Sequence, residues 1–254
     1  MNQYKVDETN NRIELLDSRF YPDENGELFP SVTTILDAYP KGPAFFEWLK
    51  LAGEKADEIR DQFGKRGSTV HRLTELYDLG EKVSLMAGGT PQYTSLEWGM
   101  FERYVDFTKR FSPEHKIIEG NFVNSTLGFG GTLDRICVIK NRLTLLDVKT
   151  SNMLHNHYWL QMAAYKGLYD LDPMGAAIHG EVQDIAILWL NSKHRTEGKG
   201  EAIQGQGWAL VRPEKSIEEY KELFKATHSL WKIEMGTLKP KNIVYTLTHK
   251  KDGL

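Results

Sequence analysis

The sequence predicts an α/β protein in which a mixed central β-sheet is flanked by helices, with a helical layer on its N-terminal side. Three features predict this fold. Apolar residues follow a helical spacing in residues 44–63 and 95–111. From His115 to Lys149 the apolar residues alternate with a period of two, which indicates consecutive strands. A helical stretch, an apolar strand and an amphipathic helix follow, so strands and helices are expected to share one core.

The N-terminal region, residues 1–111, is predicted to be mostly helical. Its expected elements are, in order, short strands around a turn within 12–30 and helices at 32–37, 44–63, 69–79 and 95–111. Residues 64–67 (Gly-Lys-Arg-Gly) are predicted to form a turn, because two glycines interrupt the helical pattern. Ser68 would then be the N-cap of the next helix, since serine is a preferred residue at that position.

The second half of the chain is predicted to build the sheet. Its expected elements are strands at 116–124, 132–139, 142–149, 184–191 and 207–211 and helices at 157–171 and 216–235. Residues 193–206 are predicted to be a polar loop. No change of composition marks a linker, so residues 1–254 are predicted to form one domain. That domain would consist of a mostly helical cap (1–111), a core (112–235) and a basic tail (236–254).

Composition and charge exclude several classes of protein. The single cysteine, Cys137, excludes an internal disulfide framework and a four-cysteine zinc or iron–sulfur site. No apolar run reaches the length of about 18 residues that a membrane helix needs. The first residues are polar and acidic, unlike a signal peptide, so a reducing cytosol is the expected location. The net charge of −3 argues against a basic coat protein for nucleic acid, but a locally positive groove remains compatible with it.

The stretch "LLDVKT", residues 145–150, carries an acid and a base two positions apart within apolar residues. If Lys140 and Asn141 form a two-residue hairpin loop, Ile139 faces Arg142. In that register Asp134 faces Asp147, with Cβ atoms about 4.5–5.5 Å apart. Lys149 then lies on the same face as Asp147, because side chains alternate along a strand.

Two interpretations of this acid pair remain open at this point. Like charges that face each other across a sheet destabilise it, and a divalent cation between them would offset the repulsion. Mg²⁺ is commonly held by one or two carboxylates together with water and substrate phosphates. Alternatively, the acids and Lys149 form surface salt bridges. A register slip of one residue would put the two acids on opposite faces.

Residues around the acid pair favour a site for a substrate. Gly130 and Gly131 give the strand of Asp134 a bare entry that is suited to close approach. Gln161 and Tyr165 are polar residues within an otherwise apolar helix, "YWLQMAAYKGLY". They are four residues apart, so both lie on one helix face and can contact one ligand.

Taken together, these motifs resemble a known family. "GGTLDR", "LLDVKT" and Gln161-x-x-x-Tyr165 are similar to the RecB-like branch of the PD-(D/E)XK nuclease superfamily. Upstream, "GSTVH" resembles the histidine motif of that branch, and "PSVTTIL…FFEWLK" resembles its phage and mitochondrial genome maintenance exonucleases. The resemblance spans residues 30–169 and implies a restriction-endonuclease-like core. The first motif lacks the proline of the superfamily, and an aspartate replaces the commoner glutamate.

The resemblance also implies roles for individual residues. Asp134 and Asp147 correspond to metal-binding acids, Lys149 to the catalytic lysine, and Gln161 and Tyr165 to residues that position DNA and the catalytic groups. The implied metal ligands are the side chains of His71, Glu119, Asp134 and Asp147 and the main-chain carbonyl of Val148. The implied cofactor is Mg²⁺ or Mn²⁺.

Other readings of these residues stay open. His71 could instead be a helix-cap residue or a buried core histidine. Glu119 could bind the metal directly, bind it through water, or pair with Lys149. Gln161 and Tyr165 could simply satisfy each other.

The function that the resemblance implies is a metal-dependent DNA exonuclease. It would hydrolyse phosphodiester bonds of single strands or DNA ends, in repair, recombination or replication. The expected partners are DNA and possible recombination proteins of a phage or its host, within the cytoplasm of a bacterial or phage-infected cell. Two alternatives are a DNA-binding module without catalysis and a structure- or site-specific endonuclease.

Overall fold

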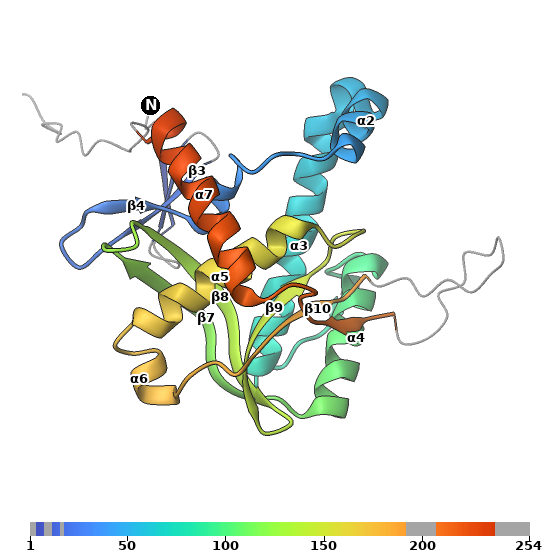
Figure 1. Cartoon of the computed structure of the whole chain (residues 1–254). Coiled ribbons are helices and arrows are strands. Elements are labelled where there is room, and N and C mark those ends of the chain that lie inside the picture. Colours follow the sequence, from blue (N-terminus) through green and yellow to red (C-terminus); the bar gives the residue numbers. More distant parts are fainter. Residues whose placement is uncertain (1–3, 8–11, 16–17, 192–206, 237–254) are drawn as a thin grey trace, which may run out of the picture.

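A five-stranded mixed sheet lies between two layers of helices in the computed structural model (Figure 1). The structure describes residues 4–7, 12–15, 18–191 and 207–236. The order of the strands in the sheet is β11-β10-β9-β8-β7. β9 and β10 are parallel, and the other neighbours are antiparallel. The predicted α/β fold with a mixed sheet flanked by helices is therefore confirmed. The strands are β7 (Glu114–Asn124), β8 (Phe129–Ile139), β9 (Arg142–Lys149), β10 (Asp184–Trp189) and β11 (Ala209–Val211).

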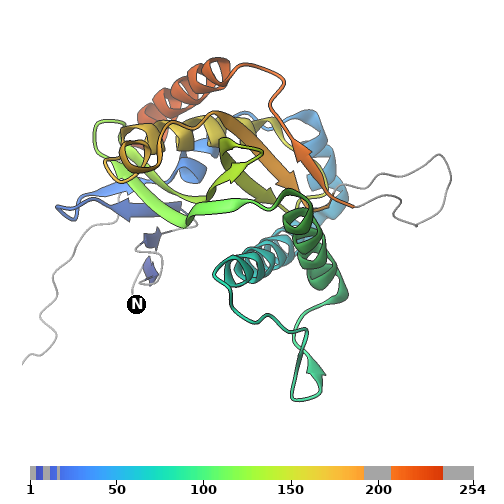
Figure 2. The ribbon, with the colours of Figure 1, turned by 90° about the horizontal axis from the view of Figure 1, so that it is seen from below.

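Each face of the sheet buries its own apolar cluster. On one face, α5 (Asn156–Leu171), α7 (Ile217–Met235) and the short α1 (Val32–Leu36) pack against side chains such as Leu133 and Leu145. On the other face, α3 (Ala56–Asp78) and α4 (Ser95–Phe111) contribute to a cluster with Leu146, Val148 and the fully buried Cys137. Figure 2 shows α5 and α7 on one side of the sheet and α3 and α4 on the other. Each such buried side chain stabilises the fold by about 1.5–3 kcal/mol.

The N-terminal region holds a second sheet as well as helices. Four antiparallel strands form it in the order β1-β2-β3-β4: β1 (Tyr4–Asp7), β2 (Arg12–Leu15), β3 (Ser18–Pro22) and β4 (Leu28–Pro30). The prediction of short strands within 12–30 is confirmed, whereas β1 was not predicted. Ser31, the N-cap of α1, also forms a bridge to Gly130 of β8, which attaches this small sheet to the large one.

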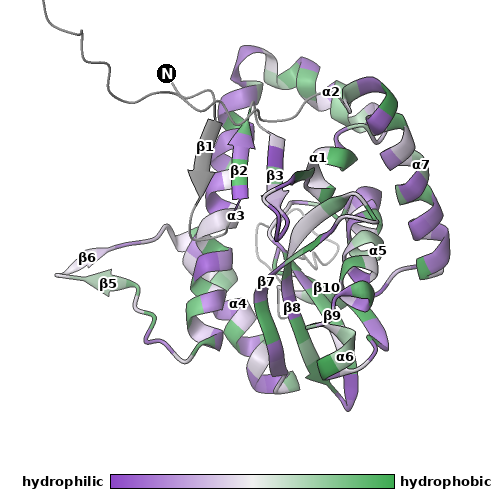
Figure 3. Cartoon of the chain, turned by 90° about the vertical axis from the view of Figure 1, so that its left-hand side faces the viewer, coloured by the Kyte–Doolittle hydropathy of each residue, from purple (hydrophilic) through white to green (hydrophobic). Residues whose placement is uncertain are grey.

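Several small elements complete the chain. α2 (Pro43–Ala52) has no buried residue and lies at one end of the molecule (Figure 3). The hairpin of β5 (Met86–Ala87) and β6 (Thr90–Pro91) projects away from the body in the same view. A short α6 (Ala176–His179) follows α5. No helix within the described ranges combines the length and the hydrophobicity that crossing a membrane requires. The predicted loop at 193–206 and residues 237–254 of the predicted tail lie outside the described residues.

The predicted turn at residues 64–67 and the N-cap at Ser68 are wrong, because α3 runs through both without interruption. A glycine in a helix interior costs only about 1 kcal/mol, and packing outweighs that cost. The helix passes close to the sheet here, since a Cβ atom at Gly67 would lie 3.4 Å from Oγ1 of Thr150, just after β9. The predicted helix at 44–63 breaks instead at Gly53, whose φ of 55° suits glycine.

The hairpin between β8 and β9 has the predicted register. Lys140 and Asn141 have φ angles of 50° and 63°, as a type I′ turn requires. Ile139 pairs with Arg142, and the same register continues to Arg135 and Leu146. The side chain of Lys140 also lies over the ring of Phe111, with Nζ 4.9 Å from the ring centroid.

A substitution at Asn141 tests how strongly the turn determines stability. A β-branched residue avoids the left-handed region, so Asn141→Val should lower the free energy of unfolding by about 1–2 kcal/mol. Asn141→Gly is the matched control and should leave it equal or raise it, since glycine adopts this conformation freely. Urea denaturation measures both. Equal stability of the two variants would contradict a type I′ turn here.

Candidate metal centre

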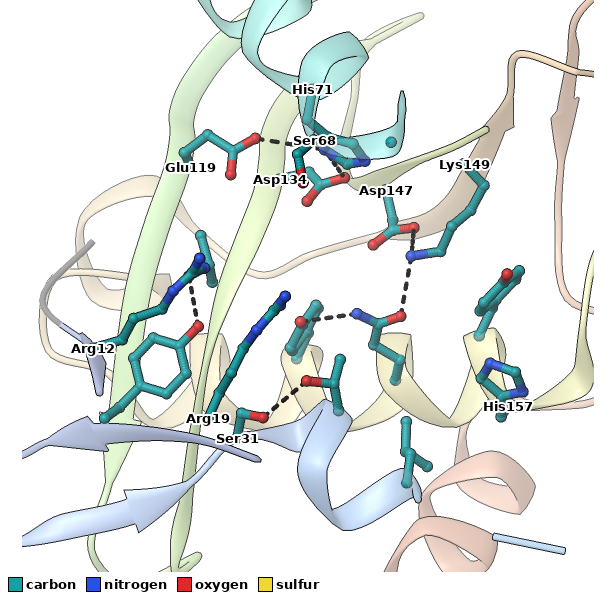
Figure 4. A pocket seen from close by; sticks show the side chains of 18 of the residues that line it. Arg12, Arg19, Ser31, Ser68, His71, Glu119, Asp134, Asp147, Lys149 and His157 are labelled. Atoms are coloured by element: carbon teal, nitrogen blue, oxygen red, sulfur yellow. Dashed lines mark hydrogen bonds and ion pairs between the residues drawn. The ribbon is translucent and has the colours of Figure 1, made fainter. Parts of the chain in front are cut away.

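A cleft of about 510 Å³ lies where the small sheet, α1, α3 and α5 meet the strands of the large sheet (Figure 4). Every candidate site residue except Val148 lines this cleft: His71, Glu119, Asp134, Asp147, Lys149, Gln161 and Tyr165. The side chain of Val148 is instead fully buried in the cluster beneath α3 and α4. The structure therefore brings together side chains from α3, β7, β8, β9 and α5.

Three of these side chains form a group that could hold a metal ion. One ligand atom each of His71, Glu119 and Asp134 lies within 4.8 Å of the other two. Nδ1 of His71 is 3.5 Å from Oδ2 of Asp134 and 3.9 Å from Oε1 of Glu119. Carboxylate oxygens are ligands for Mg²⁺ and Mn²⁺, and imidazole is a common ligand for transition metals. The donor set thus fits a divalent cation without identifying it.

Asp134 sits at the point where β8 and β9 separate. The last residues paired between these strands are Arg135 and Leu146, so Asp134 and Asp147 are the next positions of the same register. Beyond this point the main-chain N–H of Val148 donates to Oδ2 of Asp134, at 2.8 Å. The N–H and C=O of one strand residue point toward the same neighbouring strand. The carbonyl of Val148 therefore points toward β8, the strand of Asp134. Its role as a ligand stays a prediction.

Glu119 has a strained backbone within β7. Its φ is 49°, although its neighbours Ile118 and Gly120 pair regularly with Arg135 and Leu133. A left-handed conformation costs a residue with a side chain about 1–2 kcal/mol, and such strain clusters at functional sites. The conformation is accompanied by an ion pair of Glu119 with Nη1 of Arg135, at 3.0 Å.

The fully buried guanidinium of Arg135 connects Glu119 to α3 and β8. It donates to Oδ2 of Asp78 at 2.6 Å, to Oγ1 of Thr74 at 3.2 Å and to the main-chain oxygen of Asp134 at 2.7 Å. Burial opposes the charge, but the surrounding acids and Tyr104 outweigh burial and raise the pKa of Arg135. The site prediction did not include Arg135, although a second charge next to Asp134, directly before the apolar run "ICVI", was a usable signal.

Asp78 receives further contacts on its other side. The hydroxyl of Tyr104 donates to Oδ2 of Asp78 at 2.5 Å, and Nε2 of His115 lies 3.3 Å from Oδ1. Burial would raise the pKa of Asp78, but hydrogen bonding from His115 and the charge of Arg135 lower it. Asp78 and Arg135 are therefore held as charged groups, and the ion pair with Arg135 fixes Glu119 from the protein interior.

Lys149 is held between β9 and α5. Its Nζ lies 2.7 Å from Oδ2 of Asp147 and donates to Oε1 of Gln161 at 3.1 Å. Nε2 of Gln161 in turn donates to the hydroxyl of Tyr165 at 2.9 Å, so the two predicted helix residues act as one chain of hydrogen bonds. Nζ also lies 4.7 Å from the ring centroid of Tyr158. These contacts give the ammonium group one defined place in the cleft.

Close packing explains why one of the two glycines before Asp134, Gly131, has no side chain. A Cβ atom at Gly131 would lie 2.6 Å from Cε1 of Tyr165, so only glycine lets this ring lie against β8. The group that approaches Gly131 closely is the Tyr165 ring, so the predicted close backbone approach at this entry stays a prediction.

Several acidic side chains lie close together in the cleft and shift the pKa values of its titratable groups. Burial raises the pKa of Asp147 to about 6; Lys149 opposes this rise and Asp134 adds to it. Burial lowers the pKa of His71, but Asp134 and Glu119 outweigh burial and raise it to about 9. A divalent cation would relieve the same excess of negative charge. Asp147 is not among the three closest ligand groups; it lies beside Asp134 and pairs with Lys149 (Figure 4).

Comparison with known proteins adds no family to this geometry. No model of a protein family matches the chain, and no curated protein matches it.

Replacing Arg135 tests whether the interior network stabilises the site. Arg135→Met leaves Asp78 and Glu119 without their buried partner, which should lower the free energy of unfolding by about 3–5 kcal/mol. Arg212→Met is the matched control, because Arg212 also contacts a carboxylate, Asp184, at 2.6 Å but is half exposed. That change should cost about 1 kcal/mol or less. Equal losses in the two variants, measured by urea denaturation, would contradict the interpretation.

Proton release tests the metal group. His71, with a pKa of about 9, is charged at pH 7 and must lose its proton to bind an ion. Calorimetric titration with Mn²⁺ in two buffers of different ionisation enthalpy should give about one proton released per ion at pH 7. The apparent affinity should rise as the pH increases toward 9. His71→Gln should bind more weakly and lose this proton release; unchanged release would exclude His71 as a ligand.

Proposed function

We propose that the protein is a metal-dependent DNA exonuclease that hydrolyses phosphodiester bonds of single strands or DNA ends. The observation that carries the proposal is the ammonium group of Lys149, held by Asp147 and Gln161 in the same cleft as His71, Glu119 and Asp134. The similarity of "GGTLDR" and "LLDVKT" to the RecB-like PD-(D/E)XK nucleases supports it. A restriction-endonuclease-like core and a role in repair, recombination or replication are part of this proposal.

The residues that would hold Mg²⁺ or Mn²⁺ are His71, Glu119 and Asp134, joined by Asp147 and the carbonyl of Val148. Such an ion lowers the pKa of a bound water and polarises the phosphate. The protein side of the site is prearranged for this, because Arg135 fixes Glu119 and the N–H of Val148 fixes Asp134. Prearranged ligands lose less conformational entropy when an ion binds.

Lys149 would act on the substrate directly. Its ammonium group can orient the attacking water and offset the negative charge that develops on the phosphate oxygens. Burial lowers the pKa of Lys149, but Asp147 and Asp134 outweigh burial and raise it, so the ammonium group remains protonated. Gln161, supported by Tyr165, restricts the motion of Nζ. Such groups contribute most when their position needs no rearrangement during the reaction.

Removal of the ammonium group tests this role. Lys149→Ala should reduce the rate of DNA degradation by about 10²-fold or more, while the protein remains folded. Lys166→Ala is the matched control, because Lys166, a lysine of α5, also contacts an aspartate, Asp170, but lies outside the cleft. The readout is the shortening of end-labelled single-stranded DNA with Mg²⁺, with and without EDTA. Degradation by Lys149→Ala at the rate of the unchanged protein would refute the role.

The same assay separates the alternatives. Binding without metal-dependent shortening would indicate a DNA-binding module. Cleavage of closed circular DNA would indicate an endonuclease, since an exonuclease needs a free end.

A further inference from the structure

A second wall of the cleft, formed by β2 and β3 of the small sheet, faces the metal group. Arg12 and Arg19 lie on these neighbouring strands, and both line the cleft. Figure 4 shows their side chains reaching from the small sheet toward the side where His71, Glu119 and Asp134 lie. The cleft therefore has carboxylates along one wall and guanidinium groups along the other.

The small sheet holds Arg19 in a fixed position. The main-chain N–H of Arg19 donates to Oγ1 of Thr34 at 2.8 Å, and its main-chain oxygen accepts from the N–H of Ser31 at 2.8 Å. Next to it, Phe20 is fully buried, and the hydroxyl of Tyr21 is hydrogen-bonded to Oγ1 of Thr132 on β8 at 2.9 Å. The backbone of Arg19 is thus tied to α1 and, through its neighbours, to the strand that carries Asp134.

The two guanidinium groups share one carboxylate. Nη2 of Arg12 lies 3.5 Å from Oε1 of Glu14, and Nε of Arg19 lies 3.4 Å from the same oxygen. The Arg19 side chain is 46% exposed, so this ion pair is weak and can be exchanged for another anion. The two guanidinium groups offer this wall charge-assisted hydrogen-bond donors, which suit a phosphodiester group.

The size of the cleft restricts what can bind there. A volume of about 510 Å³ is that of a site for a small molecule, since such pockets span about 300–1,000 Å³. One or two nucleotides match this volume. The bond between Tyr21 and Thr132 also joins the two walls.

We propose that this cleft takes one single strand of nucleic acid and that Arg19, together with Arg12, binds its phosphates opposite the metal group. The inference rests on the proposed function and deepens it, because it names the single strand as the substrate and the small sheet as the element that selects it. Glu14 limits the affinity, since it occupies the arginine side chains and repels phosphates. This wall was not predicted, because the sequence places β2 and β3 far from Asp134.

The test is a binding measurement in EDTA, where no cleavage occurs. Fluorescence anisotropy of a labelled single-stranded oligonucleotide gives the affinity at several salt concentrations. Arg19→Gln should weaken binding about 5- to 20-fold. It should also reduce the slope of log affinity against log salt concentration by the contribution of about one phosphate contact. Glu14→Gln should tighten binding several-fold, which a purely structural role would not produce. Arg60→Gln, which removes an exposed arginine of α3 outside the cleft, is the matched control and should bind like the unchanged protein.

Two outcomes would overturn the inference: unchanged binding by Arg19→Gln, or equally tight binding of a blunt duplex of the same sequence. Thermal melting verifies that each variant is folded, and Arg19→Lys, which keeps the charge, should retain part of the affinity if Arg19→Gln is unstable. Failure of the proposed function gives a different result. In that case single strands bind with this pattern of variants, but Mg²⁺ or Mn²⁺ induces no shortening.

Discussion

Two residues in a left-handed conformation, Lys140 and Asn141, close the β8–β9 hairpin and determine which residues of the two strands face each other. Side chains alternate with a period of two, so a slip by one residue would exchange the core-facing and cleft-facing sides of β9. Asp147 and Lys149 would then leave the cleft, and Val148 would leave the cluster beneath α3 and α4. Because Asp134 accepts from the N–H of Val148, the same register also orients the carboxylate on the opposite strand.

A second constraint comes from charge buried in the interior. Arg135 is fully buried, and such a charge is tolerated only when acids and hydrogen bonds surround it. Asp78 and Glu119 provide those acids from α3 and β7, so the position of a cleft residue depends on a network that reaches the far end of α3. The strained backbone of Glu119 belongs to this arrangement, since strain of this kind persists only where the surroundings fix the conformation.

Local sequence signals predicted much of this structure. The alternation from His115 to Lys149 predicted three strands, and the loop at Lys140 and Asn141 predicted the register of the last two, β8 and β9. The turn predicted at residues 64–67 is wrong because α3 packs close to the end of β9 there, with Gly67 near Thr150, and this contact is distant in the sequence. Contacts over long sequence separations escaped prediction for the same reason. Asp78 and Arg135 are 57 residues apart, and nothing local to either residue identifies the other.

The single cysteine gives the sheet a property that is useful beyond its packing. Cys137 is fully buried between β8 and the helices α3 and α4, and burial raises the pKa of its thiol to about 12. A thiolate is the reactive form, so the native protein resists alkylating reagents both by access and by protonation. The rate of alkylation would therefore report how often the middle of the sheet opens to solvent, without any engineered label.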